Sequence, residues 1–358
     1  MRERLRESKV IVVKIGTSSL LDPLGLLDLP VVSRHLHDLV ALDRAGVRVI
    51  LVSSGAIGAG LVRLGYTERP TTIPELQATA AVGQSLLMNT YNSLLEPEGY
   101  VAAQLLLTHD DFQDRRRYLN LRNTLAALHG EPVLPVINEN DTVSVDEIRF
   151  GDNDALAALV AGLVGADLTV LLTDVDGFQL EGRRLDEVAE ITPEIEAAAR
   201  PGPGSGGMVS KLKAVTAITR AGGFALIAHG KHHRVPDLLR GEPLGTLFAP
   251  RGELGPRGRW LQALKEEGHL TVDAGSVRAL REDGRSLLPV GIIRCAGEFE
   301  AGDAVLVMGP DGPLAKGIVN YRAFDLRRIV GRRTGEIAAI LGTKEFVEAI
   351  HRDNLVLL

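Results

Sequence analysis

The feature that most constrains the fold of this chain is a repeated local order: an apolar run, a turn rich in glycine and polar residues, then a helical segment. Four apolar runs show it, at residues 10–13, 47–52, 133–137 and 168–172. Uniformly apolar runs of this length predict strands that are buried on both faces. Strands that alternate with helices predict βαβ units, and therefore an α/β fold with a mainly parallel sheet sandwiched by helices.

A second domain is expected after residue 258. The chain has 358 residues, which is more than one hydrophobic core usually fills. Glycines and prolines interrupt any periodicity between residues 244 and 259. Short apolar runs follow, separated by Gly-Asp and Pro-Asp-Gly turns, as is typical of a small, mainly β domain. We therefore predict a catalytic domain over residues 1–258 and a second domain over residues 266–358.

Composition excludes several classes of protein. The formal net charge of −6 provides no overall positive field for nucleic acid or anionic lipid. A single cysteine, Cys295, excludes an internal disulfide and a zinc site built from cysteines, which favours a reducing compartment. The charged N-terminal residues leave no signal-peptide apolar region, and no run reaches about 18 apolar residues. We expect a cytoplasmic protein with no membrane segment.

The polar turns all follow strands, and in open α/β sheets ligands bind beyond the carboxyl ends of the strands. Lys14 precedes Gly16 and two hydroxyl residues, an arrangement in which an ammonium and backbone N–H groups can approach a phosphate together. A glycine-rich turn at residues 53–56 has similar chemistry. However, a lysine at a strand end is commonly just solvated, and such turns are often only structural. Neither segment matches the P-loop pattern.

Carboxylates and carboxamides are concentrated in two segments, residues 138–141 and 150–154. Asp152, Asn153 or Asp154 could each cap the apolar helix that follows, but one helix needs one cap and three candidates are present. The acidic side chains could hold Mg²⁺ through water or orient an amino group, while Asn153 and the turn amides could receive a carboxylate. This concentration favours a ligand site.

Glycines at 202, 204, 206 and 207 lead into an amphipathic helix that carries Lys211 near its start. Because the helix dipole favours cations at the opposite end, a lysine here indicates a bound anion, and a nucleotide phosphate is the natural candidate. The alternative is a flexible loop with an incidental lysine.

Two lysines and a carboxylate cluster match the needs of phosphoryl transfer, which depends on charge stabilisation and positioning. A carboxylate nucleophile is already ionised at pH 7, so it requires no general base. The histidines at 229, 232 and 233 have no obvious carboxylate partner, and we interpret them as surface or loop residues.

Seven motifs follow one another along the chain: Val-Val-Lys-Ile-Gly-Thr-Ser (12–18), Ser-Ser-Gly-Ala-Ile (53–57), Ala-Ala-Val-Gly-Gln (80–84), Val-Ile-Asn-Glu-Asn-Asp (136–141), Phe-Gly-Asp-Asn-Asp (150–154), Leu-Leu-Thr-Asp (171–174) and Gly-Gly-Met-Val-Ser-Lys (206–211). In this order they closely resemble the glutamate 5-kinases, the first enzymes of proline biosynthesis. The resemblance covers nearly the whole chain. It implies the amino-acid kinase fold, a C-terminal PUA domain, and phosphorylation of the side-chain carboxylate of L-glutamate by ATP with Mg²⁺.

The resemblance also implies roles for individual residues. Lys14 and Lys211 resemble the charges that stabilise the transferring phosphoryl group, and Asp154 resembles the residue that organises them. The implied glutamate ligands are Ser54, Gly55, Asp141, Asp152 and Asn153. The implied nucleotide side comprises Lys14, Thr173, Asp174, Ser205, Gly206, Gly207, Met208, Val209, Ser210 and Lys211. No protein side chain is identified as a direct metal ligand. The chain departs from the family at Ser210, where threonine is usual, and in a shorter segment between Gly177 and Gly202.

Partners are implied in the same way: proline as a feedback inhibitor, a homo-oligomer (dimer or tetramer), and the reductase that consumes the labile acyl phosphate. Two alternatives remain open. One is another amino-acid kinase, acting on aspartate or N-acetylglutamate. The other is an RNA-binding protein, because PUA domains often accompany RNA-modifying enzymes. Residues 266–358 hold 14 Asp and Glu against 12 Lys and Arg, which disfavours a broad phosphate-binding face. The arginines at 322, 327, 328, 332 and 333 are interpreted mainly as solvated or salt-bridged.

Overall fold

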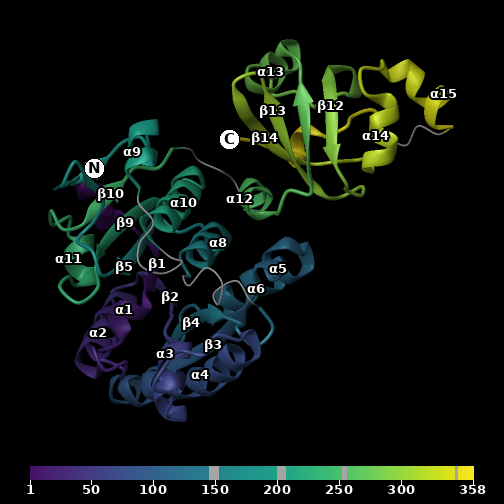
Figure 1. Cartoon of the computed structure of the whole chain (residues 1–358). Helices are drawn as coiled ribbons and strands as arrows, with labels where there is room; N and C mark the ends of the chain where they lie inside the picture. The colour runs from purple at the N-terminus through teal and green to yellow at the C-terminus, as the bar shows by residue number, and fades with distance from the viewer. Residues whose placement is uncertain (145–152, 200–206, 252–255, 343–345) are drawn as a thin grey trace. The chain divides into compact units, whose positions relative to one another are not determined.

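The structure is a computed structural model, which describes residues 1–144, 153–199, 207–251, 256–342 and 346–358. It forms two units, Met1–Glu253 and Leu254–Leu358 (Figure 1). Each unit has its own sheet and its own hydrophobic core. Within the described ranges, no helix combines the length and the apolar character that a membrane crossing requires.

The first unit is built on an eight-stranded sheet with the strand order β3-β4-β2-β1-β5-β9-β10-β8. Neighbouring strands are parallel except for β9 and β10, which are antiparallel. The strands are β1 (Val10–Ile15), β2 (Arg48–Val52), β3 (Val101–Leu107), β4 (Val133–Glu139), β5 (Leu168–Thr173), β8 (Glu187–Val188), β9 (Phe224–His229) and β10 (Thr246–Phe248); a separate hairpin contains β6 (Gln179–Leu180) and β7 (Arg183–Arg184). The predicted mainly parallel sheet is confirmed.

Helices cover both faces of this sheet (Figure 1). They are α1 (Thr17–Leu20), α2 (Leu29–Arg44), α3 (Ala56–Leu64), α4 (Ile73–Leu95), α5 (His109–Gln113), α6 (Arg115–Ala127), α8 (Asp154–Val164), α9 (Pro193–Ala198), α10 (Gly207–Arg220) and α11 (Val235–Leu239). Side chains of α2, α4 and α11 share a core with the sheet, while α8 and α10 pack together and against β1 and β9.

The side chains of β1 alternate between the two faces of the sheet. Ile11, Val13 and Ile15 belong to the core shared with α2 and α4, so the alternation of a strand directs Lys14 to the opposite face, where α8 packs. The sequence predicted that this strand ends at Val13. That boundary is wrong, because the strand continues to Ile15 and Lys14 lies buried within it. A lysine can occupy this position because a carboxylate lies opposite its ammonium, as described below.

The second unit has a five-stranded sheet with the order β12-β11-β13-β14-β15, in which only β11 and β13 are parallel neighbours. Its elements are α12 (Pro256–Ala263), β11 (Gly268–Val272), α13 (Ala274–Arg281), β12 (Ile292–Gly297), β13 (Ala304–Gly309), β14 (Gly312–Ile318), α14 (Ala323–Ile329), α15 (Ile337–Leu341) and β15 (Leu355–Leu357). The separate sheet agrees with the predicted small, mainly β domain, and the helices α12, α13, α14 and α15 accompany it in the described residues.

Two glycines allow α3 and α4 to approach each other at backbone distance. A Cβ atom on Gly83 would lie 1.7 Å from the carbonyl oxygen of Ala56, and one on Gly60 would lie 2.0 Å from that of Thr79. Both of these carbonyl oxygens are backbone atoms, so neither can rotate away from an added Cβ atom. This contact fixes α4 against the first turn of α3, immediately after the turn at residues 53–55.

We therefore expect Gly83→Ala to destabilise the first unit by roughly 2–3 kcal/mol or more, because overpacking forces the backbone to shift. Urea denaturation measures this loss. Ser85→Ala, at an exposed position on the same helix, is the control and should change the free energy of unfolding by less than about 0.5 kcal/mol. Equal stability of the two variants would contradict the close packing.

Candidate active site

The carboxyl ends of β1, β2, β4 and β5 lie at one edge of the sheet, because these strands are parallel and adjacent. Lys14 lies one residue before the end of β1, and Thr173 is the last residue of β5. Ser53 and Ser54 follow β2, and Asn138 lies near the end of β4. The topology therefore brings together the segments that the sequence singled out.

A buried carboxylate joins the two lysines. The Oδ1 of Asp154 lies 2.8 Å from the Nζ of Lys14, and its Oδ2 lies 3.0 Å from the Nζ of Lys211. Asp154 has no solvent exposure, and both lysines are buried as well. One carboxylate faces two ammonium groups, so the three side chains together carry a formal charge of +1. This arrangement suits an additional anion at the same place.

Local structure explains this placement. Asp154 is the first residue of α8, where the positive end of the helix dipole favours a carboxylate. Lys211 is the fifth residue of α10, and α10 packs beside α8, which brings its ammonium to Asp154. A lysine near the start of a helix indicates a nearby anion, and the protein itself supplies one in Asp154. A nucleotide phosphate is therefore not needed to explain why this lysine lies near the start of a helix.

Asn153 occupies the N-cap position of α8, but its side chain does not cap the helix. Its Nδ2 instead donates to the Ser53 carbonyl at 2.6 Å and to the Asn138 Oδ1 at 2.6 Å, with the Ser54 Oγ at 3.3 Å. A backbone carbonyl can only accept a hydrogen bond, so the amide nitrogen of Asn153 must face the carbonyl of Ser53. Its Oδ1 is turned away and accepts no hydrogen bond from any residue that the structure describes.

The hydrogen bonds continue from Asn153 to α4. The Oδ1 of Asn138 also accepts from the backbone N–H of Glu139 at 3.0 Å, and the Nδ2 of Asn138 donates to the Oε1 of Gln84 at 2.8 Å. On the other side, the hydroxyls of Ser53 and Tyr91 are hydrogen-bonded at 2.7 Å. Burial raises the pKa of Tyr91 above its usual value, so its hydroxyl stays protonated.

The turn after β2 depends on Gly55. This residue has φ of +92°, in the left-handed region that glycine adopts without strain, and it is the N-cap residue of α3. Ser54 is buried beside it, and its hydroxyl oxygen accepts from Asn153. The proton of that hydroxyl is consequently directed away from Asn153 and can serve another acceptor.

Of the remaining predicted glutamate ligands, Asp141 is buried in the turn that follows β4. Asp152 lies outside the described residues. The strand β4 itself extends to Glu139, whereas the sequence predicted that it ends at Ile137. Asn138 is therefore a strand residue, and the ladder with β3 fixes its backbone.

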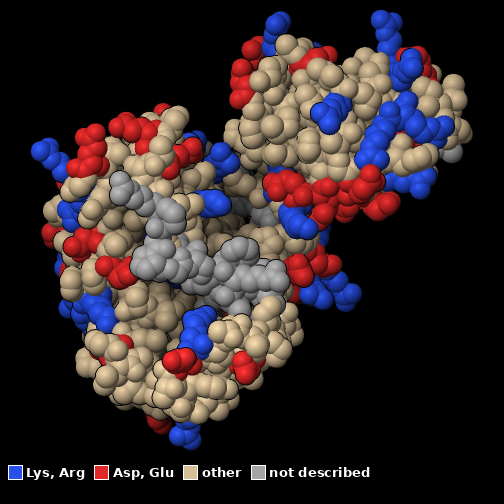
Figure 2. Space-filling model, viewed as in Figure 1, with Lys and Arg blue, Asp and Glu red and all other residues tan. Residues whose placement is uncertain are grey.

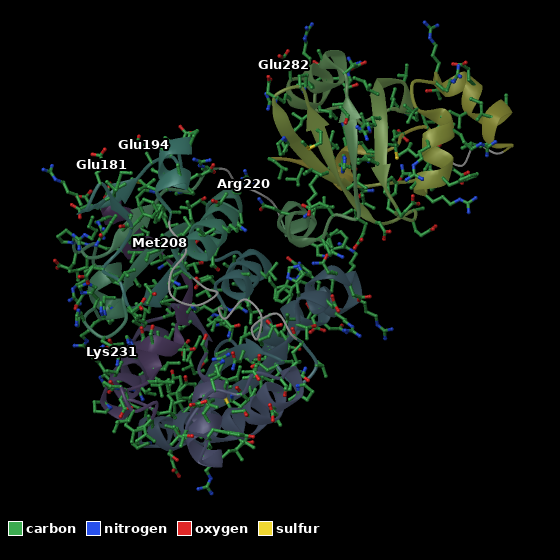
Figure 3. The ribbon with its side chains drawn as sticks, viewed as in Figure 1. Glu181, Glu194, Met208, Arg220, Lys231 and Glu282 are labelled. Atoms are coloured by element: carbon green, nitrogen blue, oxygen red, sulfur yellow. The ribbon has the colours of Figure 1, made fainter. Side chains whose placement is uncertain are left out.

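The predicted nucleotide side is formed by the end of β5 and the start of α10. The Thr173 carbonyl accepts from the Ser19 hydroxyl at 3.2 Å and from the Gly230 N–H at 2.8 Å, while the Thr173 hydroxyl donates to Asp174 at 3.0 Å. The first turn of α10 contains Gly207, Met208, Val209 and Ser210; Figure 3 labels Met208 there and Arg220 at the opposite end of the helix. Ser205 and Gly206 lie outside the described residues.

His232 and His233 lie in the loop after β9, in agreement with the sequence interpretation, whereas His229 is the last residue of β9 and His233 does have a carboxylate partner. Its Nε2 lies 3.2 Å from the Oδ1 of Asp176, and the ring of His232 stacks on that of His229 at 3.7 Å. Asp176 follows β5, so only the pairing of β5 with β9 brings it near His233. No reading of local sequence could supply this contact.

Comparisons with known proteins identify the family to which this chain belongs. The amino acid kinase family model matches residues 9–228, and the PUA domain model matches residues 268–341. The glutamate 5-kinase of Moorella thermoacetica is 47% identical over 100% of this chain and 98% of its own length. The chain belongs to the glutamate 5-kinases of the amino acid kinase family. The enzyme of the same name from Pseudomonas putida is 46% identical over the full length of both chains.

Among solved structures, the carbamate kinase from Giardia lamblia bound to AMP-PNP aligns with a TM-score of 0.49 and 20% identity. The alignment covers 68% of this chain and 99% of that one.

The sequence predicts no role for Ser53, Gln84, Tyr91 and Asn138, although three of the four lie within motifs that resemble the family. Their hydrogen bonds join residues 38, 54 and 15 positions apart. Such contacts depend on how the helices pack on the sheet. Tyr91 lies outside every motif, so nothing in the sequence marked it.

A buried histidine supports the loop next to Thr173. The Nε2 of His35 lies 2.7 Å from the carbonyl oxygen of Gly230, and burial lowers the pKa of His35 to about 4. The nearby Arg34 also lowers this pKa, whereas Asp38 opposes the change. Because the folded pKa lies below the ordinary value of about 6.5, His35 stabilises the fold fully above pH 6.5. This stabilisation is lost as the pH falls toward 4.

We expect the wild type to lose about 2 kcal/mol more stability between pH 7.5 and pH 5 than His35→Gln, which can still donate to Gly230 but does not titrate. Urea denaturation at the two pH values measures the difference. His129→Gln, at an exposed histidine, is the control and should retain the wild-type dependence on pH. An identical dependence in His35→Gln would contradict the buried neutral state.

Proposed function

We propose that this protein transfers the γ-phosphoryl group of ATP to the side-chain carboxylate of L-glutamate, giving γ-glutamyl phosphate and ADP, the first step of proline biosynthesis. The observation that carries this proposal is the buried Asp154 held between Lys14 and Lys211, beside the hydrogen-bonded group of Asn153 and Ser54. The relatives named glutamate 5-kinase, which match over the whole chain, support the choice of substrate.

In the proposed reaction, a carboxylate oxygen of glutamate forms a bond to the γ-phosphorus. The bond from that phosphorus to the bridging oxygen breaks, and its electron pair leaves with ADP. Negative charge on the migrating phosphoryl group is stabilised by the ammonium groups of Lys14 and Lys211. The attacking carboxylate is already ionised at neutral pH, so no residue has to remove a proton.

The glutamate side of the site follows from the orientation of its hydrogen bonds. The Oδ1 of Asn153 and the carboxylate of Asp141 are acceptors suited to the α-ammonium group of glutamate. The hydroxyl proton of Ser54 and the backbone N–H groups of the Gly55 turn are donors suited to its α-carboxylate. Asp152 completes the proposed set.

The nucleotide side is proposed at Lys14, Thr173, Asp174 and the segment 205–211, where the first-turn N–H groups of α10 suit a phosphate. Within the residues described, no group of three or more acidic, histidine or cysteine side chains is placed to hold a metal ion. The Mg²⁺ ion is proposed to arrive with the nucleotide, coordinated by phosphate oxygens and water, and to neutralise phosphate charge.

Further partners are proposed from the family resemblance. Proline is the proposed feedback inhibitor, acting at or near the glutamate site of a cytoplasmic homo-oligomer. The acyl phosphate product hydrolyses readily, which supports direct transfer to glutamyl phosphate reductase.

A hydroxamate assay tests the proposed function. With ATP, Mg²⁺, glutamate and hydroxylamine, we expect glutamyl hydroxamate to form and proline to reduce its rate. Hydroxamate formation with aspartate, or phosphorylation of N-acetylglutamate, in place of glutamate would overturn the choice of substrate. An unchanged rate with proline would overturn the proposed regulation alone.

The arginines of the second unit do not favour an RNA-binding surface. Arg327 pairs with Glu298 at 2.8 Å, and both Arg322 and Arg328 contact Asp325, at 2.7 and 3.7 Å. Figure 2 shows basic side chains near α14 bordered by acidic ones. These contacts offset two of the three positive charges that a phosphate backbone would need.

Lys211→Ala should lower kcat by about 10²-fold or more, because it removes a charge that acts on the transferring phosphoryl group. Steady-state kinetics with both substrates provide the measurement. Lys213→Ala removes an exposed lysine from the same helix and should leave kcat within about twofold of the wild type. An unchanged kcat with only a raised KM for ATP would contradict the role of Lys211.

A further inference from the structure

Helix α4 supports both strand ends that hold Asn153. Gln84 accepts a hydrogen bond from Asn138 on β4, and Tyr91 is hydrogen-bonded to Ser53 after β2. The two residues are seven positions apart, so they lie on one face of the helix, two turns from each other. Asn138 and Ser53 in turn provide the two shortest acceptors of Asn153.

The orientation of the Gln84 amide is determined by this chain of contacts. The backbone N–H of Glu139 requires that the oxygen of Asn138 faces it, so the nitrogen of Asn138 faces Gln84. Gln84 must therefore present its oxygen. Its Nε2 is buried and has no hydrogen-bond partner within the described ranges of the chain. Burying an amide with one donor unpaired lowers the stability of the fold. This cost indicates that the oxygen of Gln84 is kept for its hydrogen bond with Asn138.

The position of Gln84 is itself fixed. The adjacent Gly83 packs at backbone distance on Ala56, the first residue of α3, so α4 cannot slide along this contact. At the other end of the same face, Tyr91 is 1% exposed and belongs to the core of the first unit. A rigid helix face is thereby connected to two amide groups at the edge of the sheet.

We propose that Gln84 and Tyr91 are positioning residues for glutamate: they hold in place Asn138 and Ser53, the residues that accept from Asn153, without touching either substrate. This inference rests on the proposed function and extends it to residues of α4. It follows that the affinity for glutamate depends on the packing of α4. The two lysines lie on the other face of the sheet, so their positions, and hence the affinity for ATP, do not depend on this packing.

Gln84→Met tests this directly, because methionine has a similar length and no amide. We expect the KM for glutamate to rise about tenfold, as for the loss of one buried hydrogen bond, while the KM for ATP and kcat stay within about twofold. Tyr91→Phe should raise the KM for glutamate less, about threefold, because the hydroxyl of Ser53 can still donate to the Ser54 carbonyl. Asn89→Met, at an exposed carboxamide of the same helix, is the matched control and should leave all three constants unchanged.

A double-variant experiment separates positioning from general loss of structure. In the background of Asn153→Ala, neither Gln84→Met nor Tyr91→Phe should raise the KM for glutamate further, since both act through Asn153. Additive effects would overturn the proposal, as would a native KM for glutamate in Gln84→Met or an equal rise in both KM values. If Gln84→Met does not fold, the double variant of Tyr91→Phe and Asn153→Ala tests the proposal in its place. A KM for glutamate above that of Asn153→Ala alone would overturn it.

The wild type separates this inference from the proposed function. Absence of glutamate-dependent turnover in the wild type would defeat the proposed function. The crystal structure of Gln84→Met, or of Tyr91→Phe if the former does not fold, then decides the positioning role without any assay of activity. A rotated Asn153 side chain would support it, and an unchanged one would overturn it.

Discussion

The arrangement of the site depends on one buried carboxylate between two ammonium groups. Asp154 lies at the start of α8, Lys14 lies on β1, and Lys211 lies on α10, so three elements far apart in the chain meet at a single side chain. Desolvating three charged groups is costly, and only their mutual contacts compensate for this. Removing the carboxylate would leave two buried like charges. The contacts of Asp154 with the two lysines therefore hold α8 and α10 on the sheet. They also position the charges on which the proposed chemistry depends.

The two sides of the site are held by different kinds of interaction. Charges hold the proposed phosphoryl side, where the contacts to Asp154 determine the position of the two lysines. Neutral hydrogen bonds hold Asn153 on the proposed glutamate side, where its side chain donates to Ser53 and Asn138. The hydrogen bonds of Asn153 add no net charge next to the lysines, so the positive charge there remains available for the proposed phosphoryl transfer. A substrate with its own ammonium and carboxylate groups would find the donors and acceptors proposed above on this side.

Local sequence predicted the parallel sheet well, because its strands are uniformly apolar and each is followed by a glycine-rich or polar turn. It misplaced the ends of β1 and β4, because Lys14 and Asn138 are polar residues that continue buried strands. Only a distant partner, Asp154 or Gln84, makes such burial favourable, and no local pattern reports it. For the same reason the sequence identified Asn153 and Asp154 as candidates but could not tell a helix cap from a hydrogen-bonded or charged contact.

The most direct test of this account is the single-turnover rate of phosphoryl transfer in Asp154→Asn, with ATP and glutamate both saturating. Asparagine keeps the shape of the side chain but removes the charge that holds the two lysines. The account predicts a rate at least about 10²-fold below that of the wild type in a protein that still folds and binds glutamate. A rate within about threefold of the wild type would show that Asp154 does not organise the two lysines for phosphoryl transfer.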